Sequence, residues 1–168
     1  NRLKVAFPNR LLVQRLDRDT SGVMIFAQTE YAQRSLSMQF EKRQVKKVYV
    51  ARVFGVVTQR IGLINLPLIV DWENRPRQMV CHETGKVAVT EWYKLSSNEN
   101  ESRLRLVPKT GRSHQLRVHC MALGHPILGD PIYGKASSHC RMMLHSEELR
   151  VNHPESGFGS RFRSKAPF

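Results

Sequence analysis

Hydrophobic residues recur with two different periods along this 168-residue chain. Alternating or continuous apolar stretches predict β-strands, because successive side chains of a strand point to opposite faces. The clearest alternation sets Leu104 and Leu106 against Arg103 and Arg105, which predicts one buried face and one basic, hydrated face. The predicted strands are Arg10–Leu16, Gly22–Ala27, Lys47–Gly55, Lys86–Leu95, Ser102–Val107 and Met142–Val151.

Two other segments follow the helical period. Apolar residues at positions 32, 36 and 40 form one stripe, which predicts a helix from Thr29 to about Arg43 with Thr29 as its cap. A second helix is predicted from about Ser113 to Leu123, where a glycine follows as the stop signal.

The order of these elements indicates the fold class. Strands outnumber helices, and the chain lacks the regular strand–helix–strand alternation of a parallel sheet. We therefore expect an α+β fold, in which a few helices cover a mixed, largely antiparallel β-sheet. No repeat or linker divides the sequence, so residues 1–168 are expected to form a single domain.

The charge of the chain restricts the classes of function it can have. Lys and Arg number 27 against 14 Asp and Glu, which gives a formal net charge of +13 and an isoelectric point near 10.3. Basic groups that displace counterions bind phosphate backbones, so the excess favours a nucleic-acid partner over a merely soluble basic protein. No apolar run approaches the roughly 20 residues of a membrane helix, and no membrane partner is expected. Three cysteines are too few for a disulfide framework and favour the cytoplasm.

Segment 12–27 holds the strongest candidate for catalysis. It places Asp17 in a short polar loop between two apolar stretches, where a rigid scaffold can hold a carboxylate. A turn capped by Asp17 and Asp19 explains the same residues without catalysis. The spacing of Asp17, Asp19 and Thr20 also resembles the nucleophile motif of Mg²⁺-dependent haloacid dehalogenase-type phosphatases. The further carboxylates that would hold the ion are missing, which argues against that alternative.

A second candidate is segment 109–117, KTGRSHQLR. A turn at Thr110 and Gly111 precedes the second helix, whose free amide groups favour anions. Arg112 at this turn is suited to binding a phosphate, or to holding a buried carboxylate through two parallel hydrogen bonds. A solvated basic helix end is the alternative that needs no ligand. The histidines and cysteines have none of the usual metal-ligand spacings, so no metal is expected.

Taken together, these segments resemble the RluA family of RNA pseudouridine synthases. Residues 15–22 are similar to the family's HRLDxxTSG motif, and residues 46–51 to its KxYxA strand. Segments 109–117 and 124–134 match its TGRxHQLR and GHPIxGDxxYG motifs, and Leu144-His145 with Lys165-Ala166-Pro167 resembles its closing stretches. The motifs follow the family's order over nearly the whole chain. Segment 66–92 is most similar to the subgroup that modifies both ribosomal and transfer RNA.

The sequence departs from the family pattern at two places. Gln14 replaces the histidine that usually precedes Arg15, which alters any contact made by that imidazole. The family also has several dozen residues ahead of this point, so we expect the N-terminal segment to be incomplete. No separate S4-like RNA-binding domain is expected.

The resemblance implies a role for each motif residue. Asp17 is the nucleophile that attacks the target uridine, at the base or at the ribose, after which the uracil rotates and rejoins through carbon 5. Tyr49 stacks on the base and helps to remove a proton. Arg112 pairs with Asp17 and keeps it ionised, and Arg15 replaces the extruded nucleotide in the stack. Further RNA-binding or base-flipping residues are Thr20, His114 and Arg117.

The same resemblance sets the expected partners. Isomerisation involves no redox or phosphate chemistry, so no cofactor is implied. We expect a monomer with a central active-site cleft, acting on structured RNA such as a stem-loop of ribosomal or transfer RNA. Two other hypotheses stay open at this point: a non-catalytic RNA-binding protein on the same fold, and the Mg²⁺-dependent phosphatase.

Overall fold

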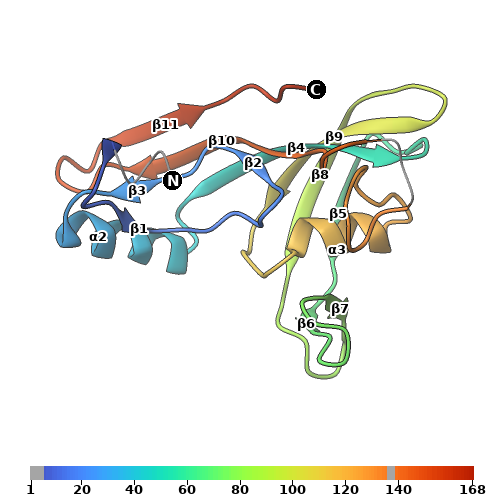
Figure 1. Cartoon of the computed structure of the whole chain (residues 1–168), viewed down its shortest axis with the longest axis horizontal. Coiled ribbons are helices and arrows are strands. Elements are labelled where there is room, and N and C mark those ends of the chain that lie inside the picture. The colour runs from blue at the N-terminus through green and yellow to red at the C-terminus, as the bar shows by residue number, and fades with distance from the viewer. Residues whose placement is uncertain (1–5, 136–138) are drawn as a thin grey trace.

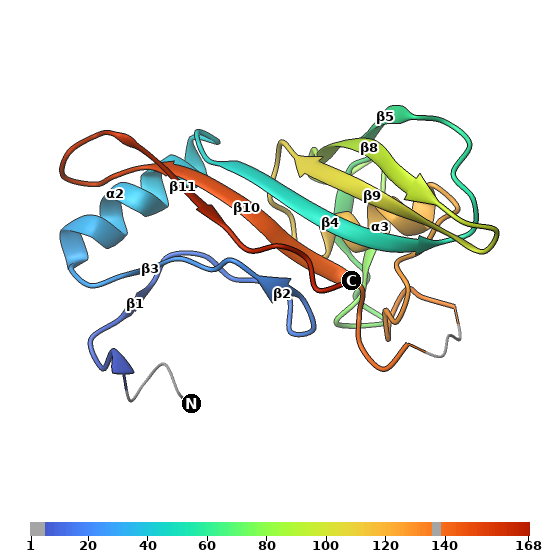
Figure 2. The same ribbon diagram turned by 90° about the horizontal axis from the view of Figure 1, so that it is seen from above.

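A computed structural model describes residues 6–135 and 139–168. Consecutive strands of its main sheet are antiparallel, which confirms the predicted fold class (Figure 2). A short strand, β2 (Ser21–Gly22), adds a parallel pairing to β10. The order across the sheet is β11 (Gly159–Arg163), β10 (Leu144–Asn152), β4 (Lys46–Phe54), β9 (Glu101–Pro108), β8 (Val89–Ser97) and β5 (Ile61–Asn65).

Both predicted helices are confirmed, and they lie on the same side of the sheet (Figure 1). Helix α2 (Glu30–Glu41) begins after Thr29, whose hydroxyl oxygen accepts a hydrogen bond from the first turn. Its apolar stripe packs against Leu149 and Val151 of β10. Helix α3 (Gln115–Ala122) covers the other end of the sheet. None of the helices in the described part of the chain is long and apolar enough to cross a membrane.

The largest group of buried apolar residues lies between α3 and the sheet. Leu104 and Leu106 of β9 are completely buried there, together with Cys120 of α3. Arg103 and Arg105 point to the other face, as the alternation predicted. This core fixes α3 against β9, and therefore fixes every side chain that α3 presents to the site described below.

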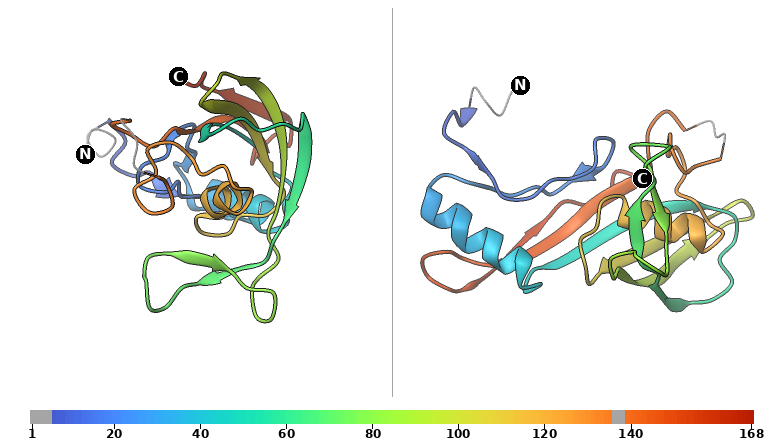
Figure 3. Two further views of the ribbon diagram at one scale, coloured as in Figure 1. Left: turned by 90° about the vertical axis from the view of Figure 1, so that its right-hand side faces the viewer. Right: turned by 90° about the horizontal axis from the view of Figure 1, so that it is seen from below.

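A hairpin missing from the sequence prediction projects away from the main sheet (Figure 3). It consists of β6 (Leu68–Val70) and β7 (Gln78–Val80), which are only three residues each and carry no clear alternation. Strands β5 and β11 were missed as well. Within residues 6–135 and 139–168, β11 pairs only with β10, and three of its five residues are charged or small and polar, so it lacks an apolar signal.

Segment 10–27 forms much less regular structure than its apolar pattern predicts. Only β1 (Leu11–Leu12) and β3 (Phe26–Ala27) pair with each other, and residues 13–20 form a loop. Alternate apolar side chains of this segment pack against the protein although its backbone does not pair continuously with another strand. The loop rejoins the sheet at Gly22, where φ is +113° and an added Cβ would lie 2.2 Å from the carbonyl oxygen of Ser146. Glycine permits both the backbone angle and the close approach.

Candidate active site

Asp17 lies in the loop between β1 and β2, with 29% of its side chain exposed. The N–H of Thr20 donates to the carbonyl oxygen of Asp17 at 3.0 Å and closes a turn. The far end of the turn is held by Ser21, whose hydroxyl oxygen lies 2.8 Å from Nδ1 of His145 on β10. The sequence predicted a turn at this place, and the backbone rather than a side-chain cap forms it.

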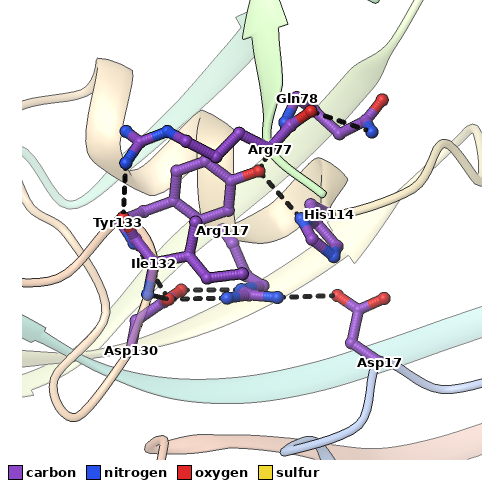
Figure 4. A network of polar contacts seen from close by, with 8 residues as sticks. All are labelled: Asp17, Arg77, Gln78, His114, Arg117, Asp130, Ile132 and Tyr133. Atoms are coloured by element: carbon purple, nitrogen blue, oxygen red, sulfur yellow. Dashed lines mark hydrogen bonds and ion pairs between the residues drawn. The ribbon is translucent and has the colours of Figure 1, made fainter. Parts of the chain in front are cut away.

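Arg117 of α3 joins Asp17 to a second, completely buried carboxylate (Figure 4). Its Nε and Nη2 each donate to one oxygen of Asp130 at 2.7 Å. Its remaining nitrogen, Nη1, lies 3.8 Å from Oδ2 of Asp17. Asp130 thus fixes the plane of the guanidinium so that its third nitrogen faces Asp17.

The prediction that Arg112 pairs with Asp17 is wrong. Nε of Arg112 instead donates to the carbonyl oxygen of Val87 at 3.1 Å, and its N–H donates to the side chain of Gln115. Arg112 occupies the turn before α3, whereas Arg117 lies one and a half turns further along the helix and faces the Asp17 loop. Arg117, which was predicted to bind RNA, is the ion-pair partner of Asp17.

A network of polar contacts extends from Asp130 toward the β6–β7 hairpin. Oδ1 of Asp130 accepts the N–H groups of Ile132 and Tyr133 at 2.9 and 3.0 Å. The hydroxyl oxygen of Tyr133 accepts the N–H of Gln78 at 2.7 Å and lies 2.8 Å from Nδ1 of His114. The tyrosine hydroxyl can donate its own proton to Nδ1, and in that arrangement a neutral His114 carries its hydrogen on Nε2.

Burial and charge set the ionisation of this network. Burial lowers the pKa of His114, as does the Arg117 charge, against the opposing effect of Asp17 and Asp130. The ring is therefore neutral at neutral pH. Burial alone would raise the pKa of Asp130, but its hydrogen bonds with Arg117 and with two backbone N–H groups outweigh burial and lower it. Asp130 is consequently an anion at neutral pH and holds Arg117 in place.

Tyr49 lies on β4, opposite Ser146 of β10. Burial raises the pKa of Tyr49 to about 12; the hydrogen bond with Ser146 opposes this increase, and the Asp17 charge adds to it. The phenol is therefore protonated at neutral pH and interacts with Asp17 electrostatically. It can accept a proton from a substrate only if its own hydroxyl proton leaves in the same step.

The remaining predicted residues lie around the Asp17 turn. Arg15 is exposed, and no hydrogen bond or ion pair joins its side chain to any other described residue. Gln14, which replaces the family's histidine, has a buried Nε2 without a hydrogen-bond partner in the described part of the chain. Thr20 is half-buried and closes the turn. Its contact with RNA, like that of Arg15 and His114, stays a prediction.

A formed cavity of about 530 Å³ lies elsewhere, between α2, β3 and the β10–β11 hairpin. Its lining is largely apolar and includes Val23, Leu36 and Val151 but not Asp17. The feature that marks the Asp17 site is the chain of charged groups from Asp17 through Arg117 to Asp130.

This fold and this pairing of a turn-borne aspartate with a buried arginine place the chain in a known class: it belongs to the RNA pseudouridylate synthase family, whose model matches residues 8–122. It is an RNA pseudouridine synthase. The chain is 49% identical to the dual-specificity RNA pseudouridine synthase RluA of Yersinia pestis, over 99% of this chain and 83% of that protein. The Escherichia coli K12 protein of the same name is 48% identical, and 78% of it is covered.

Solved structures show the same architecture. The human RNA pseudouridylate synthase domain containing 1 protein superimposes with a TM-score of 0.85 at 32% identity, over 99% of this chain and 73% of that one. Human RNA pseudouridylate synthase domain containing 4 gives a TM-score of 0.79 at 27% identity, over 94% and 72% of the two chains. Family and antiparallel sheet together exclude the phosphatase alternative, which requires a parallel sheet.

Sequence reasoning missed four members of the polar network. Asp130 and Tyr133 belong to the GDxxYG motif that carried part of the resemblance, and this motif was the signal that pointed to them. Arg77 donates to the carbonyl oxygen of Ile132 at 3.0 Å, and Gln78 bonds to Tyr133. No local pattern indicated these last two, because their partners lie 55 residues away along the chain.

Proposed function

We propose that Asp17 is the nucleophile of this synthase and that the enzyme modifies uridines in both ribosomal and transfer RNA. The observation that carries the first part is the contact of Asp17 with Arg117. A guanidinium fixed by Asp130 stabilises the negative charge of Asp17, and at 3.8 Å it leaves the carboxylate oxygens free to attack. The similarity to dual-specificity relatives supports the second part.

The chemistry follows from the groups present. If a carboxylate oxygen of Asp17 adds to the base, the glycosidic bond then breaks, the uracil rotates and rejoins the ribose through carbon 5, and loss of the carbon 5 proton releases Asp17. If the oxygen instead attacks the ribose, the uracil leaves as an anion and rotates, carbon 5 displaces Asp17 from the ribose, and carbon 5 then loses its proton. In this proposal Tyr49 stacks on the ring, as the family resemblance implies. Its phenol takes the carbon 5 proton only if its own proton moves on in the same step, with Asp17 close enough to influence it.

Base flipping gives a role to Arg15, the exposed cation beside the Asp17 turn. A uridine in a stem-loop must leave its stack before Asp17 can reach it, and Arg15 is free to fill the vacated position. His114 presents Nε2–H as a donor, while Thr20 holds the turn in place. The proposal also includes a monomeric enzyme in the cytoplasm, where the free thiols of Cys81, Cys120 and Cys140 stay reduced.

Release of tritium tests this proposal. Unmodified ribosomal and transfer RNA transcripts, labelled with tritium at carbon 5 of uridine, are incubated with the enzyme. We expect both RNAs to release tritium and to yield pseudouridine on digestion to nucleosides, with or without a chelator. Release from one RNA alone would contradict dual specificity. Tight binding of both without release would instead support the non-catalytic RNA-binding alternative.

A further inference from the structure

Two basic side chains outside the Asp17 network, Arg43 and Lys47, repel each other electrostatically and form no ion pair with a carboxylate of the described residues. Lys47 is on β4, two residues before Tyr49, so both side chains point to the same face of the strand about 7 Å apart along it. Nζ of Lys47 donates to the carbonyl oxygen of Thr110 at 3.0 Å. An ammonium has three N–H groups, and Thr110 is the only acceptor of Lys47 among the described residues. Two N–H groups of Lys47 can therefore donate to a ligand.

Arg43 is the second cation. Burial of Lys47, followed by the charge of Arg43, lowers the pKa of the lysine to about 8. No carboxylate in the described ranges forms an ion pair with either side chain. The fold thus keeps two mutually repelling cations together, an arrangement that an anion between them would stabilise.

The backbone at Arg43 supports a functional reason for this arrangement. Arg43 follows the end of α2 with φ of +57°, and the N–H of Gln44 donates to the carbonyl oxygen of Gln39. Glycine or asparagine is favoured at this position of a helix end. Among the described residues, the only other non-glycine residue with positive φ is His114, which belongs to the Asp17 network. A strained backbone kept at both places suggests that each side chain is needed.

Gly111 leaves the ammonium uncovered. Its φ lies outside the positive range, so the turn itself does not require glycine. A Cβ at this position would lie 3.3 Å from Nζ of Lys47. The missing side chain therefore keeps one side of the ammonium open.

We propose that Arg43 and Lys47, beside the open turn at Gly111, bind one backbone phosphate of the substrate RNA next to the nucleotide that reacts at Asp17. The inference rests on the proposed function, because an RNA held at Asp17 brings its phosphates past the neighbouring Tyr49. Two donors of Lys47 and the guanidinium of Arg43 match the several acceptor oxygens of one phosphate.

A double-mutant cycle tests the shared phosphate, with Lys46 as the matched control. Lys46 is exposed and adjacent, and it points to the opposite face of β4. The affinity of a fluorescein-labelled stem-loop RNA with a loop uridine is measured by anisotropy at several KCl concentrations. We expect Lys47→Met to weaken binding about tenfold and to make the plot of log affinity against log salt shallower by about 0.7–0.9. Lys46→Met should change affinity less than about twofold.

The variant Arg43→Met should also weaken binding, and the double variant should lose little more than the worse single variant, because both cations contact one phosphate. Additive losses, or equal affinities for Lys47→Met and Lys46→Met, would overturn the inference. So would a loss in Lys47→Met with an unchanged salt slope, since that result indicates a brace for the Thr110 turn. Tritium release by the wild type on the same RNA is scored separately, so that failure of the proposed reaction is distinguishable from failure of the phosphate site.

Discussion

At the scale of single residues, Arg117 connects the reactive carboxylate to the core. Its side chain is 4% exposed and uses all three nitrogens on two aspartates. Removing such a group leaves Asp130 buried without a counter-charge, which is one of the more destabilising changes a protein can undergo. Arg112 lies at the edge of the site instead, where its Nε donates to the backbone carbonyl oxygen of Val87.

The two arginines should therefore respond differently to substitution. We expect Arg117→Met to lower the free energy of unfolding by about 3–5 kcal/mol. The variant Arg117→Lys keeps the charge but not the fork, and should lower single-turnover tritium release at least about hundredfold. As the matched control, Arg112→Met should lose less than about tenfold. A larger loss for Arg112→Met than for Arg117→Lys would restore the pairing first predicted from the sequence.

At the scale of elements, the parallel contact of β2 with β10 holds the Asp17 turn. Gly22 lies opposite Ser146, and an added Cβ would overlap the backbone there. We expect Gly22→Ala to lower the free energy of unfolding by on the order of 2–3 kcal/mol and to reduce turnover further, because the turn loses its anchor. Chemical denaturation measures the first effect. Gly124 also has a positive φ, but no atom lies within 4 Å of a Cβ added there. The variant Gly124→Ala therefore measures the cost of backbone strain without the steric overlap that Gly22→Ala adds.

A second element-scale feature joins α3 to β8 and to the start of the β6–β7 hairpin. His119 is fully buried, with Nε2 3.1 Å from the carbonyl oxygen of Leu66 and Nδ1 2.9 Å from the hydroxyl of Thr90. A carbonyl only accepts, so Nε2 carries the hydrogen and Nδ1 accepts from Thr90. Burial lowers the pKa of His119 from 6.5, and the hydrogen bond with the Leu66 carbonyl opposes this only in part.

The lowered pKa of His119 determines how the stability of the protein changes with pH. Below pH 6.5 the unfolded chain binds a proton at His119 that the folded protein does not, so stability falls as the pH falls below 6.5. The slope from this residue is at most about 1.4 kcal/mol per pH unit. Urea denaturation at pH 7 and pH 5.5 should show a smaller pH dependence in His119→Gln than in the wild type. Equal dependence in both proteins would place the effect elsewhere.

These elements also show what the sequence could predict. Helices α2 and α3 were found within two residues, because a repeated apolar stripe and a cap are local signals. The hairpin of β6 and β7 was not found, since its position depends on contacts of Arg77 and Gln78 with residues 55 positions away. Motif resemblance singled out Asp17 and Tyr49, and the Asp17 charge acts on the Tyr49 phenol in the fold. It could not decide whether Arg112 or Arg117 faces Asp17, which depends on the rotation of α3 about its axis.

At the scale of the whole molecule, basic side chains outnumber acidic ones by 13. Buried acids are already neutralised: Glu148 is held between Arg150 and Arg161, and Asp130 by Arg117. The uncompensated cations are consequently available to phosphates. We expect the affinity for a stem-loop RNA to fall at least about hundredfold between roughly 50 and 200 mM salt, and to exceed that for duplex DNA of the same sequence. A flat salt response would contradict a phosphate-binding surface.

The most direct test of the account is pseudouridine formation by Asp17→Asn, compared with Asp19→Asn. The first substitution keeps the size of the side chain but removes its charge and the nucleophilic oxygen. Asp19 is exposed in the same loop and has no place in the network, so it controls for the loss of a carboxylate there. We expect no detectable pseudouridine from Asp17→Asn, RNA affinity within roughly tenfold of the wild type, and near-normal yield from Asp19→Asn. Full pseudouridine yield from Asp17→Asn would contradict the central claim.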